Sequence, residues 1–330
     1  MDTSEVVRDD ERNARSETET SAQDPNQAIL KDITLKDPIN TIAELIDLYE
    51  KLHPWTLNEY QKKGFSEEHL KGFHWAYRGQ PQDFGSLVPS FQRQFKHQFR
   101  GAAALIESRM IHDFRDHYGR LPQTNDDMPQ PHQIAGGHDL RCLSVMQHYE
   151  IPTRLLDWTS DFWIALYFAC ASDPGQPAEL WFYDRGLFQG QRAGDPTLEA
   201  FLDQTPKPQD EPEFLGRPYG DLLVEVDPQI SPRMRHQFAH HTISSSVFSD
   251  HAPALVALDK STPIFFGNLP GQGEQQRRVN RVLIDANCKG KTLQFLDQNV
   301  GITASTIFPD VVGLGRYLRW QFDSLRTMIL

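Results

Sequence analysis

The chain has 330 residues, of which 38% are hydrophobic, and its formal net charge is −12 at pH 7. This content is enough for a sizeable core, and three widely spaced cysteines without a Cys-x-x-Cys pair argue against zinc-ribbon and thioredoxin-like redox sites. The acidic charge argues against nucleic acid as the main partner, although a basic cleft would still allow it. We find no apolar run that could span a bilayer and no signal peptide, so we expect a cytoplasmic protein without a membrane partner.

The first 27 residues are predicted to form a disordered acidic tail. They hold eight acidic residues and three arginines but almost no large apolar side chain, so burial could not offset the entropy cost of ordering them. Residues 28–330 are predicted to form one domain. An insertion at 189–220 that bears Pro, Asp and Gly interrupts this domain, and we expect it to be a mobile insert or a functional lid.

Hydrophobic periodicity places helices and strands in an irregular order along the domain. Thr41 and Glu44 have the spacing of a capping box at the start of the first helix. Because helices and strands do not alternate regularly, the sequence predicts an α+β fold. We expect helices at 41–52, 102–118, 140–149, 162–171, 293–300 and 311–330, and strands at 73–77, 178–183, 221–226, 242–248, 263–266 and 278–284.

The densest group of polar residues follows the helix that ends near Tyr149. Leucines and an apolar helix flank this group, so Arg154 and Asp157 would each be costly to bury without a partner. Two interpretations stay open. The two residues form a structural clamp that pins a loop, or Arg154 binds an anionic ligand on which aromatic rings stack.

A second candidate is the Tyr77-Arg78-Gly79 segment, at the end of an apolar strand. The guanidinium group of Arg78 suits phosphate or carboxylate, and Gly79 would permit the close approach of a ligand to the backbone. An ordinary turn at the end of a strand is the alternative explanation.

Histidines offer two weaker signals. His148 lies close in sequence to Arg154 and Asp157 and is a candidate for acid–base chemistry, although a structural histidine at a helix end explains it equally well. His236 and His240 have the spacing of a metal-binding helix face, but the residues that follow look like a strand, and we expect no metal.

These motifs resemble the FRG domain family, which is named for a Phe/Tyr-Arg-Gly motif. The resemblance covers roughly residues 70–320. The sequence departs from the family pattern at Glu150, where Gly is usual, and at Ala239 and His241, where Gly and Phe are expected. The matching segments are Tyr77-Arg-Gly-Gln80, Leu143-x-x-x-Gln147-His-Tyr149, Pro152-Thr-Arg-Leu-Leu-Asp-Trp-Thr159, Ala165-Leu-Tyr-Phe-Ala169, Ser231-Pro-Arg-x-x-x-Gln237, and Gly301-Ile302 leading to Thr306-Ile-Phe-Pro-Asp310.

The order of these parts also has a looser resemblance to NAD-dependent ADP-ribosyltransferases. It implies a central split or mostly antiparallel sheet flanked by helices, with NAD or a related nucleotide as co-substrate and a protein as a possible acceptor. Those enzymes hold NAD on a first-strand Arg or His and stabilise the transition state with a late Glu. The resemblance implies binding roles for Tyr77, Arg78, Gly79, Gln80, Thr153, Arg154, Trp158, Thr159 and Tyr167, and chemical roles for Arg78, Arg154, Asp157, His148, Gln237 and Glu225.

The leading hypothesis is therefore an NAD-using transferase or glycohydrolase, and it requires Arg78 and Arg154 to converge at one cavity. Two other functions stay open. One is a non-catalytic domain that binds a nucleotide or a protein, and the other is a nuclease-like or RNA-modifying enzyme centred on His148. The residues indicate neither the oligomeric state nor the biological role, including a role as a toxin or in defence.

Overall fold

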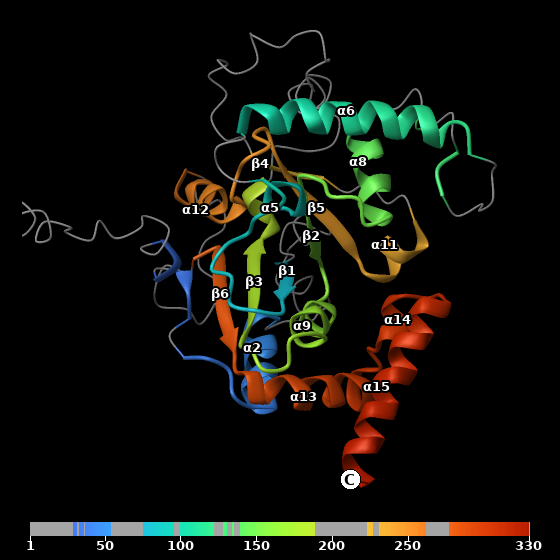
Figure 1. Cartoon of the computed structure of the whole chain (residues 1–330). Helices are drawn as coiled ribbons and strands as arrows, with labels where there is room; N and C mark the ends of the chain where they lie inside the picture. Colours follow the sequence, from blue (N-terminus) through green and yellow to red (C-terminus); the bar gives the residue numbers. More distant parts are fainter. Residues whose placement is uncertain are drawn as a thin grey trace, which may run out of the picture.

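An antiparallel sheet forms the centre of the protein, with the strand order β4-β5-β2-β1-β3-β6 (Figure 1). Each neighbouring pair of strands runs antiparallel, which confirms the predicted α+β class and the mostly antiparallel sheet. The strands are β1 Trp75–Gln80, β2 Leu155–Thr159, β3 Ala178–Asp184, β4 Leu223–Val226, β5 Ala239–Ser244 and β6 Val279–Ile284.

The structure, a computed structural model, describes most of the chain outside its N-terminal segment. The predicted acidic tail at 1–27, the insertion at 189–220 and the strand at 263–266 lie outside the described residues, so the predicted domain boundaries stay predictions. The described residues are 29–31, 33–35, 37–53, 75–95, 100–121, 128–130, 134, 139–188, 223–226, 231–261 and 277–329.

Helices cover both faces of the sheet. The described residues contain no helix with the length and apolar character needed to cross a membrane. The α-helices are α2 Ile42–Leu52, α5 Ser90–Arg93, α6 Arg100–Tyr118, α8 Asp139–His148, α9 Phe162–Cys170, α11 Pro232–His236, α12 His251–Ser261, α13 Ala286–Phe295, α14 Ala304–Ile307 and α15 Val311–Ile329, and the shorter turns are η3 Arg185–Phe188 and η5 Leu296–Val300.

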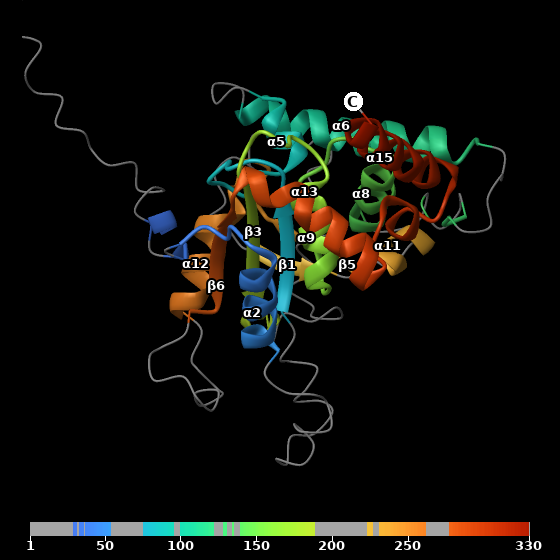
Figure 2. The same ribbon diagram turned by 90° about the horizontal axis from the view of Figure 1, so that it is seen from below.

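One face of the sheet is covered by two separate groups of helices. Helices α2, α9 and α13 pack on β1, β3 and β6 (Figure 2), whereas α6 and α8 pack on β2, β4 and β5. Side chains alternate between faces along a strand, so Leu155, Asp157 and Thr159 of β2 all lie on this face. Leu155 belongs to the core under α8, and Thr159 accepts a hydrogen bond from the backbone N–H of Asp161, the N-cap of α9. Asp157 therefore lies at the boundary between the two groups.

The sheet is joined unevenly at its middle. Strand β1 pairs with β3 along its whole length, from Trp75 to Gln80, but its register with β2 consists of one pair, Tyr77 opposite Thr159. Beyond that pair, the Nη1 atom of Arg78 donates a hydrogen bond to the backbone carbonyl oxygen of Asp157 at 2.7 Å. A side chain thus satisfies a carbonyl group that a regular ladder would pair with a backbone N–H.

Capping residues explain several helix starts. Thr41 and Glu44 form the predicted capping box at α2, and the chain leaves the turn after α13 at Gly301, with a φ of 80°. The predicted helix at 293–300 in fact begins at Ala286, because Asp285 caps its N-terminus. The predicted strand at 242–248 instead runs from Ala239 to Ser244.

The buried side of α6 is not formed by all of its apolar residues. Ala103 and Ile111 are buried, but Leu105 and Ile106 are exposed. The buried polar residue Glu107 takes a place on the inner side of this helix, because it pairs with an arginine of the core.

Candidate functional site

The most unusual side chain on the sheet is that of Asp157. It is 58% exposed, although the other four residues of β2 are buried. Partial burial raises the pKa of this carboxyl group, but its close contacts with His241, Arg78 and Gln147 outweigh the effect of burial and hold the pKa of Asp157 below its ordinary value. The site thus presents an ionised carboxylate in the middle of the sheet.

Two neighbours hold this carboxylate in place. The side-chain amide of Gln147, in α8, donates to Oδ1 of Asp157, and its carbonyl oxygen accepts from the hydroxyl group of Thr153. An ionised carboxylate can only accept hydrogen bonds, so the NH₂ end of the amide faces Asp157 and its oxygen faces Thr153. The Nδ1 atom of His241 lies 3.0 Å from the same Oδ1 atom, in a contact whose geometry is not that of a hydrogen bond.

Arg154 does not belong to this site. Its side chain is buried against Glu107 of α6, with Nε donating to Oε1 at 2.9 Å and Nη2 donating to Oε2. Nη1 also lies within reach of the carbonyl oxygens of Ser244 and Ser245. The expected convergence of Arg78 and Arg154 at one cavity is therefore wrong. The clamp interpretation holds, but with Glu107 rather than Asp157 as the partner.

The aromatic residues expected to stack on a ligand are mostly sealed in the core. Tyr77 meets Phe162 edge-on at 5.4 Å and is fully buried. Trp158 is buried against Tyr183, and its Nε1 atom donates to Oγ1 of Thr242 at 2.9 Å. Neither ring offers a face to a ligand, whereas Tyr167 is only partly buried.

Two further residues of the Tyr-Arg-Gly-Gln motif also serve the fold. A Cβ atom on Gly79 would lie 1.9 Å from the carbonyl oxygen of Ala165, so this glycine makes room for α9 rather than for a ligand. Gln80 is buried and donates to Ser86 and Glu179. The two corrections have different causes, because α9 lies against the backbone of β1 at Gly79, whereas Gln80 lies opposite Glu179 of β3 and contacts its side chain.

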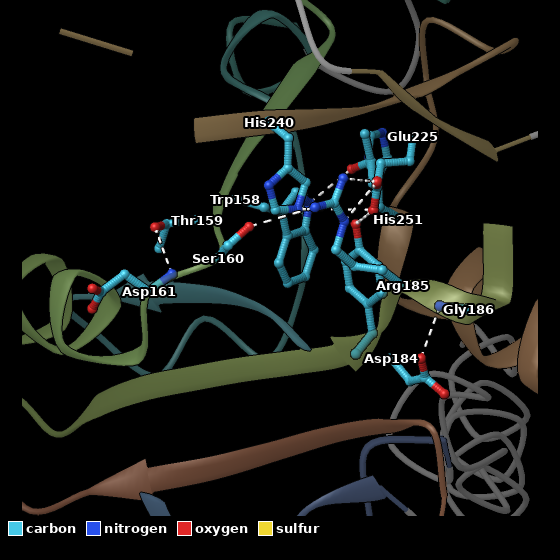
Figure 3. Close-up of polar contacts among 12 residues, drawn as sticks. Trp158, Thr159, Ser160, Asp161, Asp184, Arg185, Gly186, Glu225, His240 and His251 are labelled. Atoms are coloured by element: carbon cyan, nitrogen blue, oxygen red, sulfur yellow. Dashed lines mark hydrogen bonds and ion pairs between the residues drawn. The ribbon is translucent and has the colours of Figure 1, made fainter. Parts of the chain in front are cut away.

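Glu225 lies on the face of the sheet opposite to Asp157, where its side chain points toward Arg185 (Figure 3). It accepts hydrogen bonds from Nε of Arg185 at 2.8 Å and from the hydroxyl group of Tyr183 at 2.7 Å. His240 is near its second oxygen, at 3.8 Å. Because Glu225 lies on the opposite face and pairs with Arg185 there, it does not face a sugar bound at Asp157.

Next to Asp157, α8 meets α11, and the basic side chains of His148 and Arg233 lie at this junction. We call this junction the cationic edge. Nδ1 of His148 lies 3.3 Å from the hydroxyl oxygen of Ser231, which also caps α11. Burial, and then the charge of Arg233, lower the pKa of His148. The charge of Asp157 raises the pKa of Arg233, although burial lowers it more, so the two groups are close enough to interact.

Gln237 and Thr159 connect this edge to α14. The hydroxyl group of Thr159 donates to the backbone oxygen of Gln237 at 2.7 Å, and the amide of Gln237 donates to the carbonyl oxygen of Ile307 at 3.4 Å. The side-chain amide of Gln237 is thus engaged in a structural hydrogen bond to α14, which weakens its expected catalytic role.

The departures from the family pattern lie around the site. Glu150, in place of the usual glycine, has a φ of 61°, which glycine adopts at lower cost. Ala239, the second departure, follows Phe238, which has a φ of 46° and is 60% exposed. His241 brings an imidazole to Asp157 through the pairing of β5 with β2. Sequence reasoning did not assign roles to Gln147 and His241, because only the strand register and the turn after α8 bring them to Asp157.

A protein-family model of the FRG domain matches residues 73–176. Comparison with curated proteins and with solved structures gave no match. The matched segment includes β1, α8, β2 and α9, and with them Arg78, Gln147, His148 and Asp157. Residues 73–176 of the chain thus match the FRG domain model, and this matched segment supplies the carboxylate at the centre of the candidate site.

Proposed function

We propose that the chain binds NAD or a related nucleotide at the open part of the sheet around Asp157, and that Asp157 acts on the ribose. The observation that carries the proposal is the ionised, exposed carboxylate in the middle strand of an otherwise buried sheet. Gln147 and His241 contact this carboxylate, and Arg78 holds the backbone oxygen of the same residue. A reacting centre needs this kind of preorganisation.

The chemistry would be transfer or hydrolysis at the ribose. The bond between C1′ and the nicotinamide nitrogen breaks, and the nitrogen keeps the electron pair. Positive charge then develops on the sugar, and a fixed carboxylate beside it lowers the barrier. Water or an acceptor side chain adds to C1′ and gives up a proton.

Asp157 takes the place that the sequence assigned to Gln237 or Glu225. The amide of Gln237 is engaged by Ile307, and Glu225 is paired with Arg185 on the other face. Arg78 becomes a positioning residue, because it holds the backbone of β2 at Asp157. Burial lowers the pKa of Arg78 to about 10, so the group still carries its charge at neutral pH.

The test combines calorimetric titration with NAD and an assay of nicotinamide release. We expect the wild-type chain to bind and cleave NAD. Asp157→Asn keeps the size of the side chain, so it should retain the fold and lose roughly 100-fold or more in turnover, as expected for loss of transition-state stabilisation. Asp116→Asn, at an exposed ion pair on α6, is the matched control and should change neither measurement.

The outcomes separate the possible functions. A wild-type chain that does not bind NAD would overturn the proposal. Binding without turnover would leave a nucleotide-binding module, the non-catalytic alternative. Turnover that survives in Asp157→Asn would show that another group performs the chemistry.

A further inference from the structure

We propose that Arg233 of α11 and Arg316 of α15 form a binding site for phosphate at the cationic edge of the candidate site. The assignment of this phosphate to a nucleotide rests on the proposed function, but the anion site can be measured by itself.

Both guanidinium groups are organised by one aromatic ring. The Cζ atom of Arg233 lies 4.4 Å from the centroid of the Phe308 ring, and that of Arg316 lies 4.9 Å from it. Phe308 is buried and meets Phe168 edge-on at 6.1 Å, so the ring is fixed. Contact with an aromatic face orients a guanidinium plane while its N–H donors stay free.

The charges of the two arginines are not compensated by a close partner. Neither guanidinium group forms a hydrogen bond or an ion pair with any described residue, and the charge of Arg316 lowers the pKa of Arg233. The partly buried Arg185 and Arg278, by contrast, each contact a carboxylate. Arg233 is partly buried and shares the Phe308 ring with the exposed Arg316, and a bound anion would relieve the cost of burying its charge.

The acidic neighbours do not fill this role. Glu150, Asp310 and Asp157 each raise the pKa of Arg233 through their charge, but none comes within ion-pairing distance of it. Asp310 instead accepts a hydrogen bond from the backbone N–H of Gly313 in the first turn of α15. The donors of both arginines thus remain available to an added group.

The chemistry favours a phosphate or a pyrophosphate. Arginine forks bind such groups through paired, charge-assisted hydrogen bonds, and two forks match an anion with several oxygens. Arg233 lies on α11, which packs on β5 beside the strand of Asp157, so a nucleotide whose phosphate is held by the arginines would extend toward the carboxylate.

The test uses calorimetric titration of the full chain with inorganic pyrophosphate, at low and at physiological ionic strength. We expect binding by the wild-type chain, and binding about tenfold or more weaker in Arg316→Gln and in Arg233→Gln, since each loses charge-assisted hydrogen bonds. Arg235→Gln is the matched control, because Arg235 lies on the same short helix but is exposed. It should change the affinity less than about twofold, as screened surface charges do.

Thermal unfolding of each variant checks the fold. Arg316 is exposed, so Arg316→Gln decides the question even if Arg233→Gln does not fold. The proposal is overturned if the wild-type chain does not bind pyrophosphate, or if Arg235→Gln weakens binding as much as the other two variants.

Titration with NAD separates this site from the proposed function. Pyrophosphate binding that depends on both arginines, in a chain that does not bind NAD, supports the anion site and refutes the nucleotide function. NAD binding and cleavage that are unchanged in Arg233→Gln and Arg316→Gln support the function and refute the assignment of the anion site to the phosphates of the nucleotide.

Discussion

Replacing Arg154 by leucine tests whether this residue is a structural clamp. The substitution would leave the carboxylate of Glu107 buried without its partner and would remove the donor to the backbone oxygens of Ser244 and Ser245. Breaking a buried ion pair from one side costs about 3–5 kcal/mol. Because the total stability of a protein is only about 5–15 kcal/mol, we expect a large fall in the urea concentration at which the variant unfolds, measured by circular dichroism.

Two further variants make this test specific. Arg109→Leu breaks an exposed ion pair with Asp113 on the same α6 helix. It should leave the midpoint of urea unfolding, which is the urea concentration at which half of the protein is unfolded, unchanged. The double variant Arg154→Leu with Glu107→Leu removes both buried charges, and it should recover much of the stability lost in the single variant. If Arg154→Leu unfolds at the wild-type midpoint, the clamp interpretation fails and Arg154 again becomes a candidate ligand residue.

Three other predictions concern stability and use the same urea measurement. Gly79→Ala should destabilise the fold by about 3 kcal/mol or more, because the new Cβ atom would clash with backbone atoms of α9; an unchanged midpoint would contradict this packing. Glu150→Gly should stabilise it by about 1 kcal/mol, because residue 150 has a positive φ; a loss of stability would show that the charge of Glu150 matters more. Burial lowers the pKa of His251 from 6.5 to about 3, so below pH 6.5 the unfolded chain binds a proton that the folded chain does not. Between pH 6.5 and about 3, His251 should therefore contribute a fall in the free energy of unfolding of about 1.4 kcal/mol for each pH unit, and the total fall should be less steep in His251→Gln.

Local patterns in the sequence predict much of the fold. The capping box of Thr41 and Glu44, the glycine after α13 and the apolar run of α9 each depend on residues close in the chain, and all are present. The partner of Arg154 was not predictable in this way. Glu107 lies 47 residues away, on a helix whose buried side depends on that same pair.

The candidate site depends even more on long-range contacts. Asp157 belongs to a predicted motif, but its exposure follows from the boundary between α8 and α9 on one sheet face. His241 reaches it only because β5 begins at Ala239, three residues before the predicted strand. A shift of strand register moves side chains between faces, and the sequence pattern of this segment does not fix that register.

The imidazole of His241 offers a last test of the site, because phenylalanine is the residue expected here from the family pattern. His241 contributes most to holding the pKa of Asp157 down, whereas burial acts in the opposite direction. His241→Phe should therefore raise the pKa of this carboxyl group, which NMR titration of the side-chain carboxyl carbon measures without any assumption about function. His236→Phe, at the exposed end of α11, is the control. An unchanged titration of Asp157 in His241→Phe would mean that Gln147 and Arg78 suffice to keep the carboxylate ionised, and that the departure from the family pattern has no electrostatic role at this site.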